Sequence, residues 1–249
     1  MREIDINCDV GEGSGADAEI LAHVTSANVA CGFHAGGPHS MRATVALAAA
    51  RGVAVGAHPA FADAEGFGRL PARAGAEETY EIMLYQIGAL WAFAAAAGIQ
   101  LQHVKPHGAL YNLAAIDPPI AAAVARAVRD FDRRLVLFGL AGSHLLTAGR
   151  EAGLRTASEV FADRAYQRDG KLLPRDEPGA VLTNPGEVVE RAVRMAKEGR
   201  IQTTDGTDVV VRADTICVHG DTPGAAALAR AVKTALTAEG FTLRAVGRR

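Results

Sequence analysis

Short apolar segments alternate with longer amphipathic segments along the whole chain. The short segments are rich in valine, isoleucine and leucine, which is typical of strands that helices cover on both faces. We predict strands over Ile4–Cys8, Ala27–Cys31, Val53–Ala57, Leu101–Lys105, Leu135–Phe138, Thr156–Val160, Ala180–Thr183 and Thr215–Val218. Such regular alternation of strands and helices predicts a sheet that is mostly parallel.

The longer segments carry the start and stop signals of helices. Residues 117–132 open with Asp117 as the N-cap and a proline in the first turn, and the dipeptides at 184–185 and 222–223 repeat this signal. Residues 77–97 place their large apolar side chains on one stripe, which predicts a helix packed on the core. Glycines stand just past the predicted helices, where a left-handed residue is needed, at Gly52, Gly98, Gly153, Gly199 and Gly240.

These elements predict one domain over residues 1–249 of the α/β class. A distorted (β/α) barrel of about seven mostly parallel strands is favoured, and an open doubly wound sheet is the alternative. Two stretches interrupt the alternation of strands and helices. Residues 161–178 form a polar loop that is too long for an ordinary connection. Residues 201–212 predict an inserted β-hairpin around the turn dipeptide Asp205-Gly206.

Composition narrows the class of protein without indicating a function. The apolar fraction of 49%, the charged fraction of 22% and the net charge of −2 are those of an ordinary globular protein. Dispersed charge predicts no nucleic-acid partner, and the lack of a long apolar run or a signal-like start predicts a cytoplasmic protein without a membrane span. The three cysteines, Cys8, Cys31 and Cys217, lack CxxC spacing, so we expect reduced, buried thiols.

Side chains that can act as acids, bases or ligands lie within or just after six of the predicted strands, toward their carboxyl ends. Because the carboxyl ends of all strands in a parallel barrel point to one rim, we expect these side chains to converge there. The rim candidates are Asn7, Asp9, Glu12, Asn28, His34, His58, His103, Lys105, His107, Asn112, Glu159, Asp163, Arg164, His219 and Asp221. Any one histidine could instead be a buried structural residue, but the joint pattern favours a functional rim.

The same side chains could bind a divalent metal ion, for which the candidates are Asp9, His34, His58 and Asp221. The sequence contains no HxH or HExxH spacing, so this interpretation stays open. It also contains no GxxxxGK[ST] loop and no GxSxG elbow. A nucleotide would therefore have to bind without a standard phosphate loop.

Several long motifs in this order resemble the LamB/YcsF family. They are DINCDVGEG (5–13), SANVACGFHAGGP (26–38), VGAHPAFAD (55–63), GFGR (66–69), HVKPHGALYN (103–112), SEVFADRAYQRDGKLLPR (158–175) and ICVHGDTPGA (216–225). They span the chain from its first strand to its last helix. One departure is Ala60, where the resemblance leads us to expect glycine; alanine would resist a positive φ at that turn.

The resemblance implies a barrel like those of deacetylases and glycoside hydrolases. It also implies a subunit of an ATP-dependent 5-oxoprolinase, which opens the lactam of 5-oxo-L-proline to L-glutamate as ATP becomes ADP and phosphate. Such a subunit works with two partners, the 5-oxoprolinase B and C subunits, and self-association is also possible. ATP would come with a divalent cation, Mg²⁺ by expectation, and no resident transition metal is expected.

Lactam activation by phosphorylation needs cations for the phosphoryl charge and a base for the attacking water. We assign Lys105 to the phosphoryl charge, with Arg69 and Arg164 helping. The full catalytic set is Asp9, His58, Lys105, His107, Glu159, His219 and Asp221, and the binding set is Asn7, Glu12, Asn28, His34, Arg69, Asn112 and Arg164. Two alternatives remain: a metal-dependent deacetylase or amidohydrolase acting on a carbohydrate or cyclic amide, and a non-catalytic binding subunit.

Overall fold

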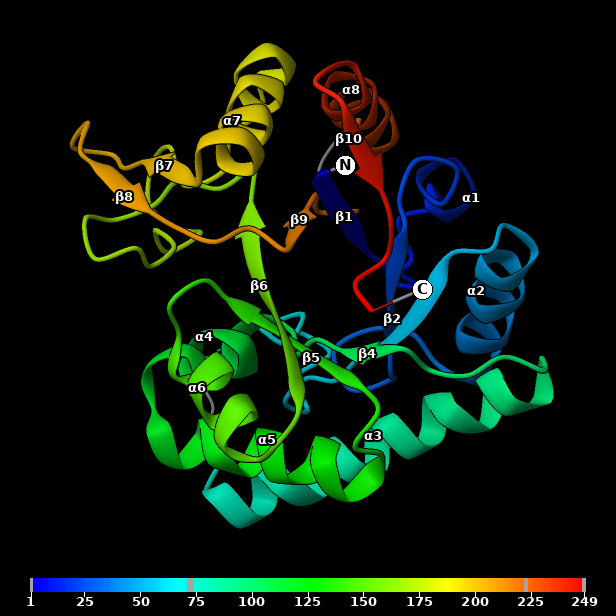
Figure 1. The fold of residues 1–249 in the computed structure, drawn as a ribbon. Helices are drawn as coiled ribbons and strands as arrows, with labels where there is room; N and C mark the ends of the chain where they lie inside the picture. Colours follow the sequence, from blue (N-terminus) through cyan, green and yellow to red (C-terminus); the bar gives the residue numbers. More distant parts are fainter. Residues whose placement is uncertain (1, 71–73, 222–223, 248–249) are drawn as a thin grey trace.

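Seven parallel strands close into a barrel in the computed structural model, which describes residues 2–70, 74–221 and 224–247 (Figure 1). The barrel strands, in spatial order, are β1 (Arg2–Val10), β2 (Ser26–Ala30), β3 (Ala54–His58), β4 (His103–Val104), β5 (Val136–Leu140), β6 (Arg155–Phe161) and β9 (Thr215–Cys217). Closure comes from β1, which pairs with β2 along one stretch and with β9 along another. The predicted barrel is confirmed, and the open sheet is excluded.

Helices surround the barrel and link its strands (Figure 1). They are α1 (Asp17–Ile20), α2 (Pro38–Ala50), α3 (Ala76–Ala96), α4 (Gly108–Ile116), α5 (Pro118–Phe131), α6 (His144–Glu151), α7 (Pro185–Glu198) and α8 (Ala225–Ala238). The predicted caps hold: Asp117 accepts a hydrogen bond from the backbone N–H of Ile120, and Asn184 caps α7 in the same way. The start signal at 222–223 lies outside the described residues.

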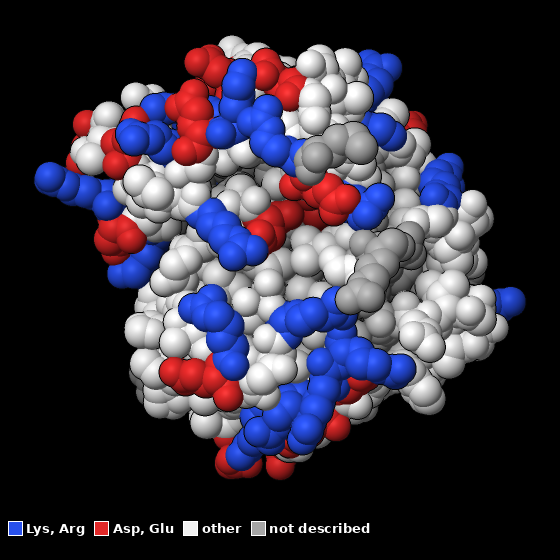
Figure 2. Space-filling model, viewed as in Figure 1, with Lys and Arg blue, Asp and Glu red and all other residues white. Residues whose placement is uncertain are grey.

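Charged side chains of the helices lie on the solvent side and pair with each other. Figure 2 shows lysine and arginine side chains gathered around α5, with acidic side chains beside them. Arg126 on α5, for example, is 2.8 Å from both carboxylate oxygens of Glu77. Exposed pairs of this kind add little stability, and they mark a solvated surface.

Two predictions of strands need correction. Residues Ala180–Thr183 form no strand; only an isolated bridge joins Val181 to Arg164, inside the irregular segment between β6 and α7. Conversely, the short strand β10 (Phe241–Leu243) was not predicted, and it pairs in parallel with the first residues of β1. Both errors concern short segments, for which periodicity cannot separate a strand from other buried chain.

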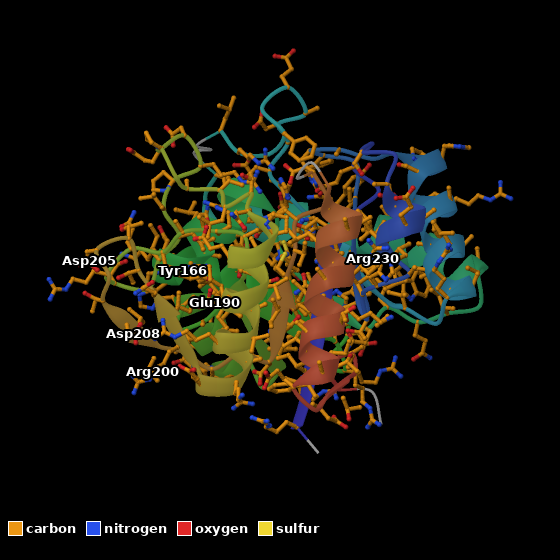
Figure 3. The ribbon with its side chains drawn as sticks, turned by 90° about the horizontal axis from the view of Figure 1, so that it is seen from above. Tyr166, Glu190, Arg200, Asp205, Asp208 and Arg230 are labelled. Atoms are coloured by element: carbon orange, nitrogen blue, oxygen red, sulfur yellow. The ribbon has the colours of Figure 1, made fainter. Side chains whose placement is uncertain are left out.

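The segment 201–212 contains an antiparallel pair, β7 (Arg200–Gln202) and β8 (Asp208–Val210), joined by a turn in which Gly206 has a φ of 83°. Figure 3 shows Arg200, Asp205 and Asp208 at the edge of the molecule. The hairpin lies beside α7, where Arg194 contacts Asp208 at 2.5 Å. It therefore contributes to the outside of the barrel rather than to its mouth.

The inside of the barrel is polar, and β1 shows why. Its residues alternate between faces, as side chains of any strand do. Ile4, Ile6, Cys8 and Val10 belong to the apolar core between strands and helices, whereas the alternate residues hydrogen-bond across the barrel interior. Asp5 accepts hydrogen bonds from the hydroxyls of Thr25, Ser26 and Thr215 near the amino end of the barrel. This polar stack rises along β1 toward the carboxyl rim.

Cys8, Cys31 and Cys217 are free and buried, as predicted. Among the residues that the structure describes, no helix combines the length and apolar character needed to cross a membrane.

Candidate active site

A buried ammonium group organises the centre of the barrel mouth. Lys105 follows β4, and its Nζ lies 2.9 Å from Asp9 Oδ1 and 3.0 Å from Glu159 Oε1. The same Nζ also contacts Asn7 Oδ1 at 3.2 Å and Cys217 Sγ at 3.1 Å. An ammonium has three hydrogens, so these neighbours occupy all of its hydrogen-bonding capacity.

Charge pairing overcomes burial in this centre. Although burial disfavours the ammonium, Asp9 and Glu159 hold the pKa of Lys105 well above its usual range. Burial likewise disfavours the Asp9 carboxylate, but His58 and Lys105 keep the pKa of Asp9 well below its usual range. Lys105 and Asp9 therefore form a charged, buried ion pair.

Neutral amides and hydroxyls complete the network. Asn28 Nδ2 donates to Asn7 Oδ1 at 2.7 Å and to Asp9 Oδ1 at 2.8 Å. Glu159 accepts from Asn7 Nδ2 at 2.9 Å and from the Tyr111 hydroxyl at 2.7 Å. These amide, hydroxyl and carboxylate groups are thus paired, which avoids the ~1–3 kcal/mol cost of each unpaired buried group.

Three histidines and Glu12 form a second group beside Asp9. The ligand atoms of Glu12, His34, His58 and His107 all lie within 4.8 Å of one another. His58 and His107 approach closely, with 2.9 Å between His58 Nε2 and His107 Nδ1. The His34 ring stacks on the His107 ring at 3.8 Å, and the three histidines are buried.

Backbone carbonyls fix the rings of this histidine group. His58 Nδ1 donates to the carbonyl of Lys105 at 2.7 Å, and His107 Nε2 donates to the carbonyl of Phe67 at 2.9 Å. Phe67 has a φ of 56°, and it is the one non-glycine residue with a positive φ among the described residues. This conformation is unfavourable for a bulky side chain. The surrounding structure holds Phe67 so that its carbonyl meets His107 and its ring meets the edge of His34.

The histidines differ in protonation. Burial and the neighbouring charge of His58 hold the pKa of His107 well below its usual range, and burial lowers that of His34. The pKa of His58 is raised, because attraction to the Asp9 carboxylate exceeds the effect of burial. Electrostatics alone therefore keep two rings neutral and favour a proton on the third.

A histidine on the opposite side of the mouth is oriented by a carboxylate. His219 follows β9, and its Nδ1 lies 3.0 Å from both oxygens of Asp163, which follows β6. Asp163 also accepts from the His219 backbone N–H at 3.1 Å. Burial would favour neutral Asp163, but His219 lowers its pKa, so the carboxylate stays charged. In this pairing His219 Nδ1–H donates to the Asp163 carboxylate, which leaves Nε2 as the nitrogen that can accept a proton.

The outer edge of the mouth carries opposite charges. Asp221 lies 2.5 Å from Arg69 Nη2 and 3.3 Å from Arg175 Nη1. Partial burial opposes ionisation of Asp221, but Arg175 and Arg69 lower its pKa. The side chains of Arg69 and Arg175 are 34% and 25% exposed, so these two cations face solvent as Lys105 does not.

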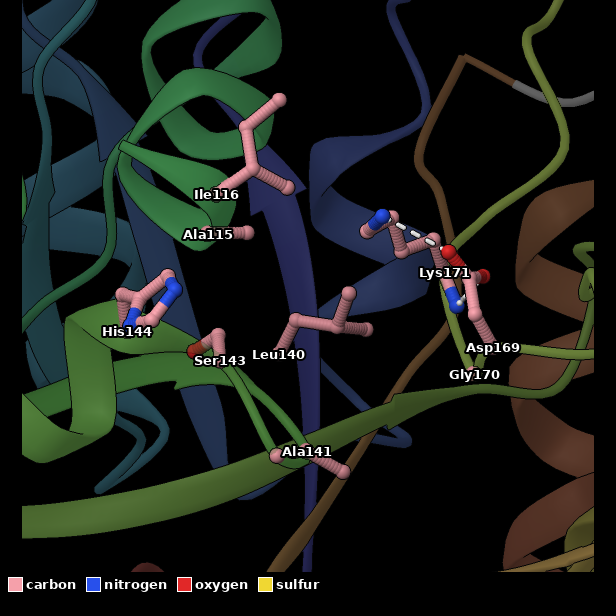
Figure 4. A pocket seen from close by; sticks show the side chains of 10 residues that line it. Ala115, Ile116, Leu140, Ala141, Ser143, His144, Asp169, Gly170 and Lys171 are labelled. Atoms are coloured by element: carbon pink, nitrogen blue, oxygen red, sulfur yellow. Dashed lines mark hydrogen bonds and ion pairs between the residues drawn. The ribbon is translucent and has the colours of Figure 1, made fainter. Parts of the chain in front are cut away.

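A pocket of about 200 Å³ opens at the carboxyl end of β5, on the same side of the barrel as the mouth. Figure 4 shows Leu140, Ser143 and His144 on one wall and Lys171 with Asp169 on another. Its walls come from the end of α4, from the β5–α6 connection and from the segment after β6. The pocket thus adjoins the rim rather than containing the buried histidines.

Comparison with known proteins places this geometry in a family. Residues 4–249 match the profile of the LamB/YcsF family. The chain belongs to the LamB/YcsF family. It is 53% identical to the A subunit of 5-oxoprolinase from Geobacillus kaustophilus, over 98% of this chain and 97% of that protein.

Two solved structures agree with the architecture of this LamB/YcsF chain. A lactam utilization protein from Thermus thermophilus superposes with a TM-score of 0.91 at 50% identity, covering 98% of this chain and 99% of that one. The peptidoglycan deacetylase PdaC from Bacillus subtilis gives a TM-score of 0.51 at 15% identity, covering 98% and 88%. The second likeness concerns the fold alone, and it agrees with the predicted likeness to deacetylase barrels.

Most of the predicted rim residues come together. The buried centre contains Asn7, Asp9, Glu12, Asn28, His34, His58, Lys105, His107 and Glu159, with His219 beside it and with Arg69 and Asp221 at the outer edge. Two predicted residues lie elsewhere. Asn112 is exposed on α4. Arg164 donates to the carbonyls of Ala180 and Leu173, so its guanidinium holds the segment after β6 together.

Two members of this network, Tyr111 and Arg175, were not predicted from the sequence. Asp163, which was predicted as a rim residue, stands two residues past the end of β6. Tyr111 lies one helical turn after His107, on the same side of α4, and this spacing is also readable. The pairing of Arg175 with Asp221 has no sequence signal, because the two belong to separate connections.

Ala60 has no positive φ, so alanine is not strained there.

Proposed function

We propose that this chain is the A subunit of a 5-oxoprolinase, acting in the ATP-dependent opening of 5-oxo-L-proline to L-glutamate. The full-length 53% identity to a protein of that name supports the proposal. The word subunit in that name indicates further subunits, and we infer that the partners of this chain are the B and C subunits.

The observation that carries the proposal is the Asp163–His219 pair facing Asp9. Asp9, Cys217 and His219 offer ligand atoms within 4.8 Å of one another at the mouth. Hydrolysis of a lactam needs a base that takes a proton from water and an acid that returns one to the leaving nitrogen. His219, held by Asp163, can exchange one proton in this way. The Asp9 carboxylate, fixed by Lys105 and Asn28, can orient the water or the lactam N–H.

The described residues constrain where ATP phosphates and Mg²⁺ would bind. Lys105 has no free hydrogen for a phosphate, because Asp9, Glu159, Asn7 and Cys217 surround its ammonium. Arg69 and Arg175 are cationic and partly exposed at the same mouth. We therefore propose that these arginines meet the phosphates and that Asp221, released from them, helps to hold the cation. Lys105 would instead hold Asp9 in its charged, oriented form.

The test measures glutamate and ADP release by this chain together with B and C subunits. We expect His219→Gln to lower kcat by about 10²–10⁴-fold, the usual range for losing a general acid–base group. The matched control is His39→Gln, an exposed histidine on α2, which should leave kcat unchanged. Glutamate release without ATP consumption, or full turnover by His219→Gln, would contradict the proposal.

A further inference from the structure

We propose that Glu12, His34, His58 and His107 form a binding site for one divalent transition-metal ion of the zinc class. These residues come from four separate segments, the connections after β1, β2 and β4 and the end of β3. Their ligand atoms nevertheless lie within 4.8 Å of one another, and the three histidine residues are at least 95% buried. The site does not depend on the proposed lactam activity, because metal binding is measured on this chain alone.

Two ring nitrogens that face each other create a conflict without a cation. A backbone carbonyl can only accept, so the contacts with the carbonyls of Lys105 and Phe67 place hydrogens on His58 Nδ1 and on His107 Nε2. In the neutral rings, His58 Nε2 and His107 Nδ1 therefore both carry lone pairs, and these atoms are 2.9 Å apart. Two lone pairs at this distance repel each other unless a cation lies beside them. A proton on His58 Nε2, which Asp9 favours, can bridge the two nitrogens, and a metal ion bound by both would take the place of that proton.

The surroundings of His34 lead to the same site. Its Nε2 lies 2.8 Å from Glu12 Oε1, while its Nδ1 is buried without a hydrogen-bond partner in the part of the chain that the structure describes. Protonation of His34 and metal binding through its Nε2 both put a hydrogen on Nδ1, so a bound metal ion has to offset the cost of one unpaired buried N–H. The ring is held instead by stacking on His107 at 3.8 Å and by the edge of Phe67. These contacts orient the ring so that its Nε2 faces Glu12 and the other imidazoles.

The distances suit a small tetrahedral ion. Zinc bonds of ~2.0–2.1 Å place neighbouring ligand atoms about 3.4 Å apart. Glu12 Oε1 lies 3.6 Å from His107 Nδ1 and 3.9 Å from His58 Nε2, and the two shorter contacts are 2.8 and 2.9 Å. Reaching 3.4 Å would change these four distances by about 0.2–0.6 Å.

The chemistry of the donors points to the same class of ion. Three imidazoles and one carboxylate favour zinc, cobalt or nickel over magnesium and calcium, which prefer oxygen. Hydrogen bonds from the far nitrogens of His58 and His107 to carbonyls are the usual outer support of metal-bound histidines. This proposal replaces the expectation that no transition metal is resident. It also places the ion next to Asp9, whose Oδ1 is 3.4 Å from His58 Nε2.

The test starts from protein freed of metal with a chelator and titrated with Co²⁺ and Zn²⁺ at pH 8. We expect one equivalent of Co²⁺ to bind, with the strong visible absorption of a tetrahedral site, and Zn²⁺ to displace it. Loss of an outer partner alone weakens metal binding ~10–100-fold, so losing a ligand in Glu12→Gln or His58→Gln should cost about 100-fold or more. His39→Gln, an exposed histidine five residues from His34, should bind as the wild type does.

Histidine ¹⁵N NMR of the wild-type protein provides a readout that needs no variant. On addition of Zn²⁺ we expect the coordinated nitrogens to be His58 Nε2 and His107 Nδ1. His219→Gln separates this site from the nearby Asp9–Cys217–His219 group and should retain binding. Three results would overturn the proposal: no stoichiometric metal uptake, uptake unaffected by Glu12→Gln, or coordination through His219.

Discussion

Lys105 Nζ and Asp9 Oδ1 lie 2.9 Å apart inside the barrel, although their residues are 96 positions apart in sequence. Both side chains are almost fully buried, at 2% and 6% exposure. Parallel closure brings the ends of β1 and β4 to one mouth, and the pair exists only when the barrel is complete. The contact therefore links the electrostatics of the site to the stability of the fold.

Removing the ammonium should destabilise the protein strongly. In Lys105→Met, the carboxylates of Asp9 and Glu159 lose their shared cation but stay buried. Breaking a buried pair from one side costs about 3–5 kcal/mol. We expect a loss of this size in the free energy of urea unfolding, with part of it recovered in Lys105→Met/Asp9→Asn. The exposed Lys197 pairs with Glu239 at 2.6 Å, and Lys197→Met should change the urea midpoint little. Equal midpoints for both methionine variants would contradict this account.

Much of the fold is readable from the sequence, because long elements carry strong periodic signals. Helix α5 shows this, since its cap, its proline and its apolar face all agree. Residues 180–183 show the limit. They are apolar, but the carbonyl of Ala180 accepts from the Arg164 guanidinium and from a backbone N–H instead of joining the sheet. A pattern of apolar residues records burial, and it does not record which backbone groups pair.

The residues of the site could be predicted from the sequence about as well as the fold. Strand ends correctly bring Asp9, His58 and Lys105 into one place, because parallel topology fixes the side of the barrel on which they lie. The partners of each group depend on side-chain directions across the barrel, and these have no sequence signal. Lys105 therefore looked like a phosphate ligand, while the structure surrounds it with protein groups. The hydrogen bond from His107 to the carbonyl of Phe67 depends on the positive φ of Phe67, and a phenylalanine in the sequence does not predict a positive φ.

A methyl group at Gly56 should disrupt the barrel interior. Gly56 lies on β3, and a Cβ there would overlap the imidazole ring of His103. His103 cannot move freely, because it is buried, contacts Asn28 Oδ1 at 2.7 Å and stacks on Phe138. Overpacking of this kind costs about 1–3 kcal/mol or more. We expect Gly56→Ala to lower the free energy of unfolding, measured by urea denaturation, by at least this amount.

The matched control for Gly56 is Gly88→Ala in α3. A Cβ at Gly88 meets no atom within 4 Å, and alanine is the better helix former, so this variant should be neutral or more stable by ~0.5–1 kcal/mol. If Gly56→Ala were as stable as Gly88→Ala, the close packing of His103 against β3 would be wrong.

Buried His103 should make stability fall with acidification. Burial, aided by the charge of Lys105, lowers the pKa of His103 to about 3, against about 6.5 in an unfolded chain. Above pH 6.5 both states are neutral at this ring. As the pH falls from 6.5 toward 3, only the unfolded state takes up the proton, so folding stability is progressively lost. By pH 5 this one ring should contribute a loss of about 2 kcal/mol.

The measurement compares urea unfolding at pH 8 and pH 5 in wild type and in His103→Gln. The glutamine does not titrate, and its amide can still donate to Asn28. The variant should start less stable at pH 8 but lose about 2 kcal/mol less on acidification. Parallel pH curves for the two proteins would show that His103 carries no depressed pKa.

The cysteine thiols should be inert in the folded protein. Burial raises the pKa of Cys217 and of Cys8 well above the usual range, although Lys105 opposes the effect at both. Because the thiolate is the reactive form, alkylation needs both exposure and deprotonation. We expect native protein at pH 8 to resist iodoacetamide, and all three cysteines to react in urea, as read by mass spectrometry. Rapid labelling of Cys217 in native protein would contradict this account.

Asp163 should act on the reaction through His219. The Asp163 carboxylate holds the hydrogen on His219 Nδ1 and keeps Nε2 available as a base. In Asp163→Asn the new amide N–H can donate to Nδ1, which favours the opposite tautomer and removes the base from the mouth. We expect kcat for glutamate release with B and C subunits to fall about 10²–10⁴-fold, while KM changes little.

The pH profile separates this positioning role from a structural one. If Asp163 only held the β6 connection, Asp163→Asn would reduce the fraction of folded protein, and kcat per folded molecule would keep its wild-type pH dependence. If Asp163 orients His219, the variant loses the limb of the kcat/KM profile that reports the base, even at temperatures where circular dichroism shows a fully folded chain. Asp163→Glu retains a carboxylate and should restore part of that limb. An unchanged profile in Asp163→Asn would remove His219 from the role of base, and Asp9 would then be the remaining candidate at the mouth.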